Sequence, residues 1–206
     1  MTSRIEIPSP RSIDPSAILG HPSPRLKPGA RLVLGPGACL RSHAVLYLGS
    51  VIGRRLETGH NVVIREGNRI GDDFQIWNNS VVDYGCRIGR RVKIHCNVYV
   101  AQYTTLEDEV FLAPGVTVAN DLYPGRALSK KWMRGPHLAR GVQVGVNATI
   151  LPYVHIGKGS LIGAGSVVTK DIPPDSMAWG NPARVYRSVK AVDAALRSRL
   201  LAHAGD

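Results

Sequence analysis

The sequence predicts an all-β protein whose chain winds as a parallel coil with three short strands per turn, and two periods predict it. The shorter period is six residues. From Leu34 to Val118, 14 of the 15 positions in one register are aliphatic, and the remaining one is Thr58. A period of six fits neither an α-helix, which needs spacings of three and four, nor a single strand, which needs two. Repeats of six residues are a signature of parallel β-helices.

The longer period is 18 residues, and glycines mark it. Gly35, Gly53, Gly71 and Gly89 each follow an aliphatic residue and lie 18 positions apart. Three six-residue units therefore complete one turn of the coil, called a rung here. Rungs should stack at the spacing of paired strands, about 4.8 Å. The aliphatic side chains then point inward, and glycine suits corners where the backbone must turn without a Cβ.

The remaining segments follow from where these periods start and stop. Residues 1–29 are rich in Pro and Ser, so we expect an extended segment with a poor first rung near Ile18. Residues 30–172 are expected to form the coil, with about five rungs, an excursion loop over 122–140 and nearly two further rungs. The excursion is basic and lacks the six-residue pattern. Loops of this length are usually functional or disordered.

The C-terminal part, residues 173–206, should contain a Pro-rich connector and a helix. Two prolines at 173 and 174 stop the six-residue pattern. From Ala183 the apolar residues recur at helical spacing, which predicts an amphipathic helix.

Composition narrows the class of protein. A chain of 206 residues that is 44% hydrophobic suits one domain. It contains no run of 18 apolar residues, so no membrane span is expected. Three isolated cysteines and the lack of an apolar signal core predict a reduced, cytoplasmic protein. The net charge of +11 could suggest a nucleic-acid partner, but the coil offers no recognition helix. Phosphorylated small ligands or a solvated face explain the charge better.

The chain resembles the hexapeptide-repeat acyltransferases from about residue 30 to residue 187. The most specific part is the ending GSLIGAGSVVTKDIPPDSMAWGNPARVYR, residues 159–187. The resemblance implies a left-handed parallel β-helix and a homotrimer. It also implies transfer of an acyl group, usually acetyl, from coenzyme A, so acetyl-CoA is the expected co-substrate.

A narrower similarity is to the N-acetyltransferases that act on nucleotide-linked amino sugars. It rests on TGHNVVIREGNRIGDD, VKIHCNVYV, TTLEDEVFLAPGVTVAND and the following YPGR. Those enzymes carry Gln-Asn-Asn or Gln-Ser-Asn where this chain has His95-Cys96-Asn97, so only Asn97 matches. We therefore expect acetyl-CoA-dependent N-acetylation of such a sugar, by direct attack of its amine on the thioester. O-acetylation of a sugar or small alcohol, and a non-catalytic β-helix scaffold, remain as alternatives.

Stacking lets candidate site residues be found in columns, because residues 18 apart lie above one another. His60, Asn78 and Cys96 form one such column, and Glu66, Tyr84, Gln102 and Asn120 form another. Arg65 should lie under Asp83 as a surface ion pair of little energetic value. An attacking amine must lose a proton, and a histidine or a carboxylate can accept it. The candidate catalytic residues are His60, Glu66 and Asn97.

Each of these has a plainer interpretation. His60 could cap a turn, Glu66 could be a solvated acid, and Asn97 could be a turn asparagine with a positive φ. Hydrogen bonding to substrate suits His95 better than general base catalysis. The candidate substrate-binding residues are Asn78, His95, Asn120 and Arg126. The resemblance further implies coenzyme contacts, for which the candidates are Gly163, Ala164, Lys170, Pro182 and Arg184.

No catalytic metal is expected. Coils of this type that bind zinc, such as the γ-class carbonic anhydrases, place two histidines five residues apart. Here His137 and His155 are 18 apart, and His137 falls in the expected excursion loop.

Overall fold

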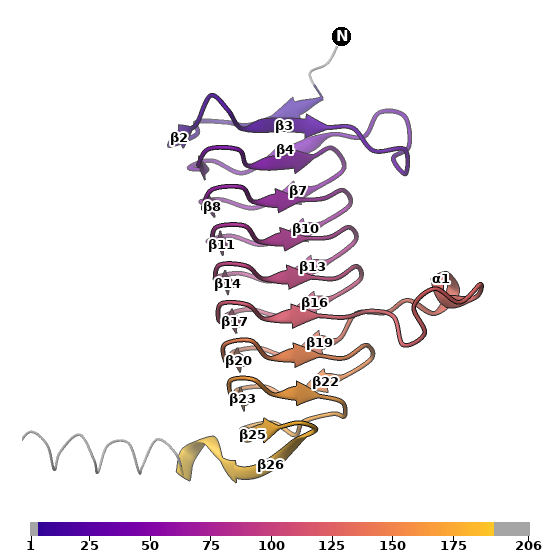
Figure 1. The fold of residues 1–206 in the computed structure, drawn as a ribbon. Coiled ribbons are helices and arrows are strands. Elements are labelled where there is room, and N and C mark those ends of the chain that lie inside the picture. Colours follow the sequence, from indigo (N-terminus) through magenta and orange to yellow (C-terminus); the bar gives the residue numbers. More distant parts are fainter. Residues whose placement is uncertain (1–3, 192–206) are drawn as a thin grey trace, which may run out of the picture.

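The computed structural model describes residues 4–191, and over this range the chain forms a column of stacked three-sided rungs (Figure 1). Three sheets, A, B and C, make the sides of the column, and within the coil all neighbouring strands are parallel. Six rungs, β1 to β18, precede the excursion loop, and two more, β19 to β24, follow it. The predicted three-sided coil is therefore confirmed.

Each side of the column is a ladder of mostly two-residue strands. Sheet A contains β1 (Ile5–Glu6), β4 (Leu32–Leu34), β7 (Val51–Ile52), β10 (Arg69–Ile70), β13 (Arg87–Ile88), β16 (Thr105–Leu106), β19 (His137–Leu138) and β22 (His155–Ile156). Sheet B contains β2 (Ser12–Ile13), β5 (Cys39–Leu40), β8 (Glu57–Thr58), β11 (Gln75–Ile76), β14 (Lys93–Ile94), β17 (Phe111–Leu112), β20 (Gln143–Val144), β23 (Leu161–Ile162), β25 (Ser176–Gly180) and β26 (Ala183–Ser188). Sheet C contains β3 (Ile18–His21), β6 (Val45–Tyr47), β9 (Val63–Ile64), β12 (Val81–Val82), β15 (Tyr99–Val100), β18 (Thr117–Val118), β21 (Thr149–Ile150) and β24 (Val167–Val168).

Four-residue turns join the strands and form three edges of the column. In the rung that starts at β10, residues 71–74 form the AB corner, residues 77–80 the BC corner and residues 83–86 the CA corner. The same names are used for the stacked turns of all rungs. Strands of successive rungs pair 18 residues apart, for example Arg69 with Arg87 and Gln75 with Lys93.

The aliphatic register fills the interior, as predicted. Ile76, Val82 and Ile94 have no exposed surface, and neither does Phe74, which lies two residues before Ile76. Because two residues of each six-residue unit point inward, a narrow column still encloses a continuous apolar core.

The glycines of the 18-residue period have a different purpose from the one expected. A Cβ on Gly71 would lie 2.8 Å from the carbonyl carbon of Gly89, one rung away. These glycines therefore permit close approach between rungs. The left-handed conformation falls two residues later in each unit, and non-glycine residues commonly hold it. Examples are Asp73 with φ 59° and Asn79 with φ 59°.

The N-terminal end of the coil agrees with the expectation, whereas the C-terminal end differs from it. Strands β1, β2 and β3 pair with β4, β5 and β6 at an offset of 27 positions, with a register shift between Leu19 and His21, so the N-terminal segment forms an irregular first rung whose aliphatic residues are not fully buried. At the other end, Ala183–Ser188 form strand β26, antiparallel to β25, and helical conformation begins only at Val189, six residues later than predicted. The hairpin extends sheet B, because β25 pairs with β23 and β26 pairs with β25. Residues 192–206 of the predicted helix lie outside the described residues.

The excursion loop ends earlier than predicted. Leu138 is fully buried and belongs to β19, so the coil resumes at His137 and not after Arg140. Thr105 pairs with His137, 32 positions later, whereas the rungs from β4 to β18 pair residues 18 apart. The loop leaves the column at the CA corner and carries one short helix, α1 (Ser129–Trp132), visible as the projection in Figure 1. No helix within residues 4–191 has the length and hydrophobicity needed to cross a bilayer.

The inward register can be tested on one strand. Ile52 and Val51 are neighbours on β7, but Ile52 is buried and Val51 is exposed. We expect Ile52→Ala to lower the free energy of unfolding by about 2–5 kcal/mol, because it removes a buried side chain and leaves a cavity. The control Val51→Ala should cost less than about 1 kcal/mol. Denaturant unfolding followed by circular dichroism measures both, and equal losses would contradict the assigned register.

Candidate active site

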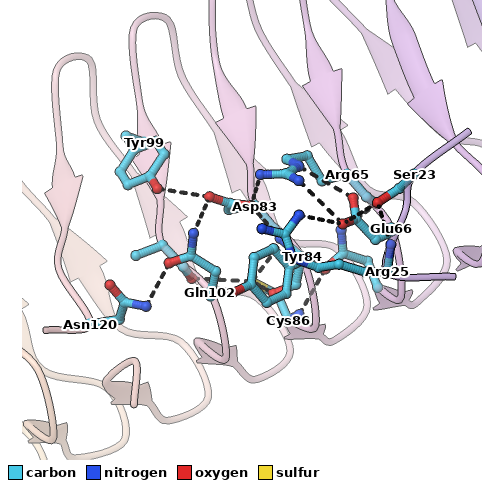
Figure 2. A network of polar contacts seen from close by, with 12 residues as sticks. Ser23, Arg25, Arg65, Glu66, Asp83, Tyr84, Cys86, Tyr99, Gln102 and Asn120 are labelled. Carbon is cyan, nitrogen blue, oxygen red and sulfur yellow. Dashed lines mark hydrogen bonds and ion pairs between the residues drawn. The ribbon is translucent and has the colours of Figure 1, made fainter. Parts of the chain in front are cut away.

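A network of polar contacts runs along the CA corner (Figure 2). At its centre lies Asp83, whose side chain is 7% exposed. Its carboxylate accepts hydrogen bonds from the phenol of Tyr99 at 2.9 Å and from the side-chain amide of Gln102. Arg65, one rung below, forms an ion pair with it at 3.0 Å. The predicted pair of Arg65 and Asp83 therefore exists, but it is largely buried and not a surface pair.

Glu66 is the second buried carboxylate of this corner, with 4% of its side chain exposed. It accepts hydrogen bonds from the hydroxyl of Ser23 at 2.9 Å and from the guanidinium of Arg65 at 3.2 Å, and Arg25 lies 3.3 Å away. Burial opposes ionisation, but the hydrogen bonds from its own backbone and Ser23, with the charge of Arg65, lower the pKa of Glu66. The carboxylate is thus held as an anion, a state that suits anchoring better than proton uptake.

The cluster continues to the excursion loop. Asn120, at the end of β18, is buried and donates a hydrogen bond to the side-chain oxygen of Gln102 at 2.5 Å. Within the loop a cavity of about 400 Å³ contains the predicted residue Arg126. Its walls are largely apolar and aromatic: Asp121, Leu122, Tyr123, Arg126, Leu128, Ser129, Trp132 and Tyr153. The column of Glu66, Tyr84, Gln102 and Asn120 predicted from spacing therefore leads from the N-terminal rungs to this loop.

The other predicted residues lie on the BC corner. His60 is exposed, and its Nδ1 is 2.6 Å from the hydroxyl of Ser42. The side-chain oxygen of Asn78, directly above, accepts the backbone N–H of His60 at 2.9 Å. His95 is half-buried and its ring meets Phe111 edge to face, with centroids 5.2 Å apart. Asn97 is exposed and adopts a left-handed φ of 59°.

The expected coenzyme residues are divided between the same corners. Gly163 and Ala164 belong to the last BC corner, and the β25–β26 hairpin with Pro182 at its turn packs beside it. A Cβ on Gly163 would lie 2.7 Å from the Cβ of Trp179, so the hairpin touches this corner. Lys170 follows β24 and is exposed at the CA corner, whereas Arg184 is exposed on β26.

A single chain thus brings together two groups of predicted residues, not one. His60, Asn78, His95 and Asn97 share the BC corner with Gly163 and Ala164. Glu66 and Asn120 share the CA corner with the start of the excursion loop and Lys170. Sheet C separates the two corners.

Sequence reasoning missed part of the CA cluster. Tyr99 lies on the outward face of β15 and Ser23 in the loop after β3, so neither belongs to a corner column. The 18-residue spacing could have pointed to Tyr99, because it pairs with Val81, the outward residue of β12 that lies two positions before Asp83. Among residues 4–191 there is no group of three or more His, Cys, Asp and Glu that could hold a metal ion.

Comparisons with known proteins show which proteins this chain is similar to. The repeats described as bacterial transferase hexapeptide (six repeats) match residues 69–102 and 135–170. A Staphylococcus aureus (strain COL) protein that bears an acetyltransferase name is 55% identical over 56 residues, 27% of this chain and 28% of that protein. Galactoside O-acetyltransferase of Escherichia coli (strain K12) is 39% identical over 99 residues, 46% of this chain and 49% of that enzyme. The chain therefore spans from about a quarter to half of the length of these curated relatives.

A solved structure extends the likeness over the whole coil. A Bacillus cereus protein titled as an acetyltransferase covers 90% of this chain and 91% of its own, with 23% identity and a TM-score of 0.54. This likeness concerns the fold. Fold and repeats together define a left-handed parallel β-helix of hexapeptide repeats. More narrowly, the resemblance to hexapeptide-repeat acyltransferases that the sequence predicted is confirmed.

The ionisation of Tyr99 tests the cluster around Asp83. Burial, and then the hydrogen bond to the Asp83 carboxylate, raise the pKa of Tyr99 from 10.0 to about 12. Because the folded pKa is the higher one, this stabilisation is fully present below pH 10 and is lost as pH rises toward 12. We expect Tyr99→Phe to flatten the loss of stability over this window, measured as unfolding midpoints at a series of alkaline pH values. Tyr123→Phe, at a tyrosine that is 68% exposed, is the control. An equal effect of both substitutions would contradict the assignment.

Proposed function

We propose that this protein is an acetyltransferase that uses acetyl-CoA. The observation that carries the proposal is the intact C-terminal end of the coil. There the segment GAGSVVTKDIPPDSMAWGNPAR, residues 163–184, closes the last rung and forms the β25–β26 hairpin beside the BC corner. The acetyltransferase names of the matched relatives support the same activity. Neither Lys170 nor Arg184 has an ion-pair partner among residues 4–191, so both can meet the phosphates of the coenzyme.

The two separated corners support a site shared between copies in a homotrimer. The outward face of sheet C carries no charged side chain on its strands from β6 onward: Val45, Tyr47, Val63, Val81, Tyr99, Thr117, Thr149 and Val167. Sheets A and B instead present charged residues such as Arg69, Glu57 and Lys93. Sheet C is therefore the face best suited to burial against other copies.

Threefold symmetry around sheet C also explains the position of the site residues. Three triangular columns that turn one face toward a common axis place the BC corner of each copy beside the CA corner of the next. His60, Asn78 and Asn97 of one copy would then line one wall of a groove. Glu66, Asn120 and the excursion loop of the neighbouring copy would line the other.

The reaction needs few groups from the protein. A neutral amine attacks the thioester carbonyl, the C–N bond forms, and the tetrahedral oxyanion collapses with loss of the coenzyme thiolate. The amine loses one proton, which His60 can accept, or which the departing sulfur can take. A backbone N–H at a corner can hold the oxyanion. Asn97 and Asn78 are suited to hydrogen bonds with the acetyl group or the sugar. Glu66 is assigned to the site as an anionic anchor, because its pKa is lowered.

The acceptor we propose is a nucleotide-linked amino sugar, with N-acetylation as the outcome. The segments TTLEDEVFLAPGVTVAND and YPGR, which border the excursion loop, support it. The second candidate is O-acetylation of a sugar, and the likeness to galactoside O-acetyltransferase favours it. Release of thiol from acetyl-CoA, measured with matched amino sugars, hydroxy sugars and their nucleotide-linked forms, separates the two. No turnover and no coenzyme binding would leave only a β-helix scaffold.

The role of His60 predicts a defined kinetic pattern. If His60 accepts the proton, His60→Ala should lower kcat by about 10²–10⁴-fold and leave the KM for the coenzyme nearly unchanged. Lys170→Ala should do the reverse, because it removes a phosphate contact and raises that KM. Both are read from steady-state thiol release. A near-normal kcat in His60→Ala would assign the proton to the coenzyme sulfur and withdraw His60 from catalysis.

The role of Asn97 needs a control for its backbone. Its left-handed φ of 59° strains most other residues, so Asn97→Ala could fail through the turn alone. Asn97→Gly keeps the turn and removes only the amide. If the amide holds the acetyl group or the sugar, Asn97→Gly should lower kcat/KM by about tenfold or more. Asn79→Gly, at the equivalent position one rung below with the same φ, is the matched control. Full activity of Asn97→Gly would leave Asn97 as a turn residue.

The shared site predicts that two defective copies can rescue each other. We expect Val81→Glu on sheet C to lower the mass in sedimentation equilibrium from trimer to monomer, because it buries a charge in the interface. Gln143→Glu on sheet B, an exposed position, is the control and should stay trimeric. His60→Ala and Asn120→Ala, once inactive alone, should regain part of the activity after joint unfolding and refolding. A fully active monomer would refute the shared groove.

A further inference from the structure

Several arginines of the coil are neutralised in one regular way, and Arg69 and Arg87 depart from it. Five arginines pair with an acid 18 residues later, on the adjoining rung: Arg54 with Asp72, Arg55 with Asp73, Arg65 with Asp83, Arg90 with Asp108 and Arg91 with Glu109. The residue 18 positions after Arg69 is instead Arg87, and the one after Arg87 is Thr105. Within residues 4–191, no ion pair or hydrogen bond engages either of these two guanidinium groups.

This arrangement places two like charges side by side. Arg69 and Arg87 are directly paired positions on β10 and β13, so their outward side chains start about 4.8 Å apart. Both are exposed on the face of sheet A. Like charges directly opposite each other destabilise a sheet, and the rest of the coil avoids them by its ion pairs. An anion bound between the two guanidinium groups would remove the repulsion.

A cavity of about 490 Å³ lies over the same strands, and Arg69, Arg87 and Thr105 line it. It also contains two acids, but both are already engaged. Glu107 accepts a hydrogen bond from His137 at 2.7 Å and from the backbone N–H of Arg140 at 2.9 Å. Asp108 is paired with Arg90 at 3.2 Å. The two free arginines therefore set the charge of the cavity, and the hydroxyl of Thr105 adds a donor next to them.

We propose that Arg69 and Arg87 bind the diphosphate of a nucleotide ligand on the outer face of sheet A. The planar fork of each guanidinium suits two phosphate oxygens, and two forks on neighbouring strands suit two adjacent phosphoryl groups. The site lies three residues beyond Glu66 and Tyr84 of the CA corner, about 10 Å along the chain. It thus borders the groove in which acetyl transfer is proposed to occur. The choice of a nucleotide as the ligand rests on that proposed function. Both the nucleotide-linked sugar and the coenzyme contain a diphosphate.

Calorimetric titration of the full-length protein tests the site without turnover. The probes are inorganic pyrophosphate, UDP and coenzyme A, at one fixed low ionic strength. We expect the double variant R69Q/R87Q to bind pyrophosphate at least about tenfold more weakly than the unchanged protein. The matched control R54Q/R55Q removes the same charge from two ion-paired arginines and should stay within about twofold. R69K/R87K keeps the charge but loses the forks, so intermediate weakening is expected.

The probes distinguish the source of the diphosphate. A loss with UDP and not with coenzyme A assigns the site to the acceptor, and the opposite result assigns it to the coenzyme. Equal affinities of all variants, or no binding of pyrophosphate by the unchanged protein, would overturn the site. A change of sedimentation in R69Q/R87Q without any change in affinity would also overturn it, since the arginines would then contact another copy. A failure to acetylate would refute the proposed function but leave these affinities as measured.

Discussion

Along most of the coil each residue rests on the residue 18 positions away, and this constraint organises the molecule. Parallel pairing in one register repeats from rung to rung, so like positions form straight columns through the protein. Inward columns become the core, glycine columns let backbones approach, and charged columns alternate into ion pairs. The residue type that fits a position therefore depends on the residues stacked above and below it.

Stacking also brings together the partners that a buried polar corner needs to offset its lost hydration. Carboxylates lose hydration when they are buried, and the loss is recovered only if charged and hydrogen-bonded partners replace the water. At the CA corner Arg65 reaches both Glu66 and Asp83, while Ser23, Tyr99 and Gln102 supply the remaining donors. Among residues 4–191, no buried side-chain nitrogen or oxygen lacks a hydrogen-bond partner. The corner is thus a rigid polar surface that stacking holds in place.

The sequence periods predict the regular positions of the coil, but they do not predict the segments that interrupt it. The inward positions, such as Ile76 and Phe74, follow from spacing alone, as do the columns of Glu66 and His60. The spacing of the apolar residues places the start of the C-terminal helix at Ala183, too early, because the residues of β26 also fit a helical spacing. The loop after β3 brings Ser23 and Arg25 onto Glu66, and no local pattern encodes such a contact. The division of the site between two corners required the order of the sheets in space.

Both long departures from the coil leave at one edge. Residues 22–31 and the excursion before His137 connect sheet C to sheet A, and the strands on either side remain paired with the neighbouring rungs. The free energy needed to close a loop grows only slowly with its length, so this edge tolerates insertions of very different size. The column then acts as a fixed frame with one replaceable attachment. Evolution, or an engineer, can exchange the attachment to accept a new acceptor molecule while the frame keeps its fold.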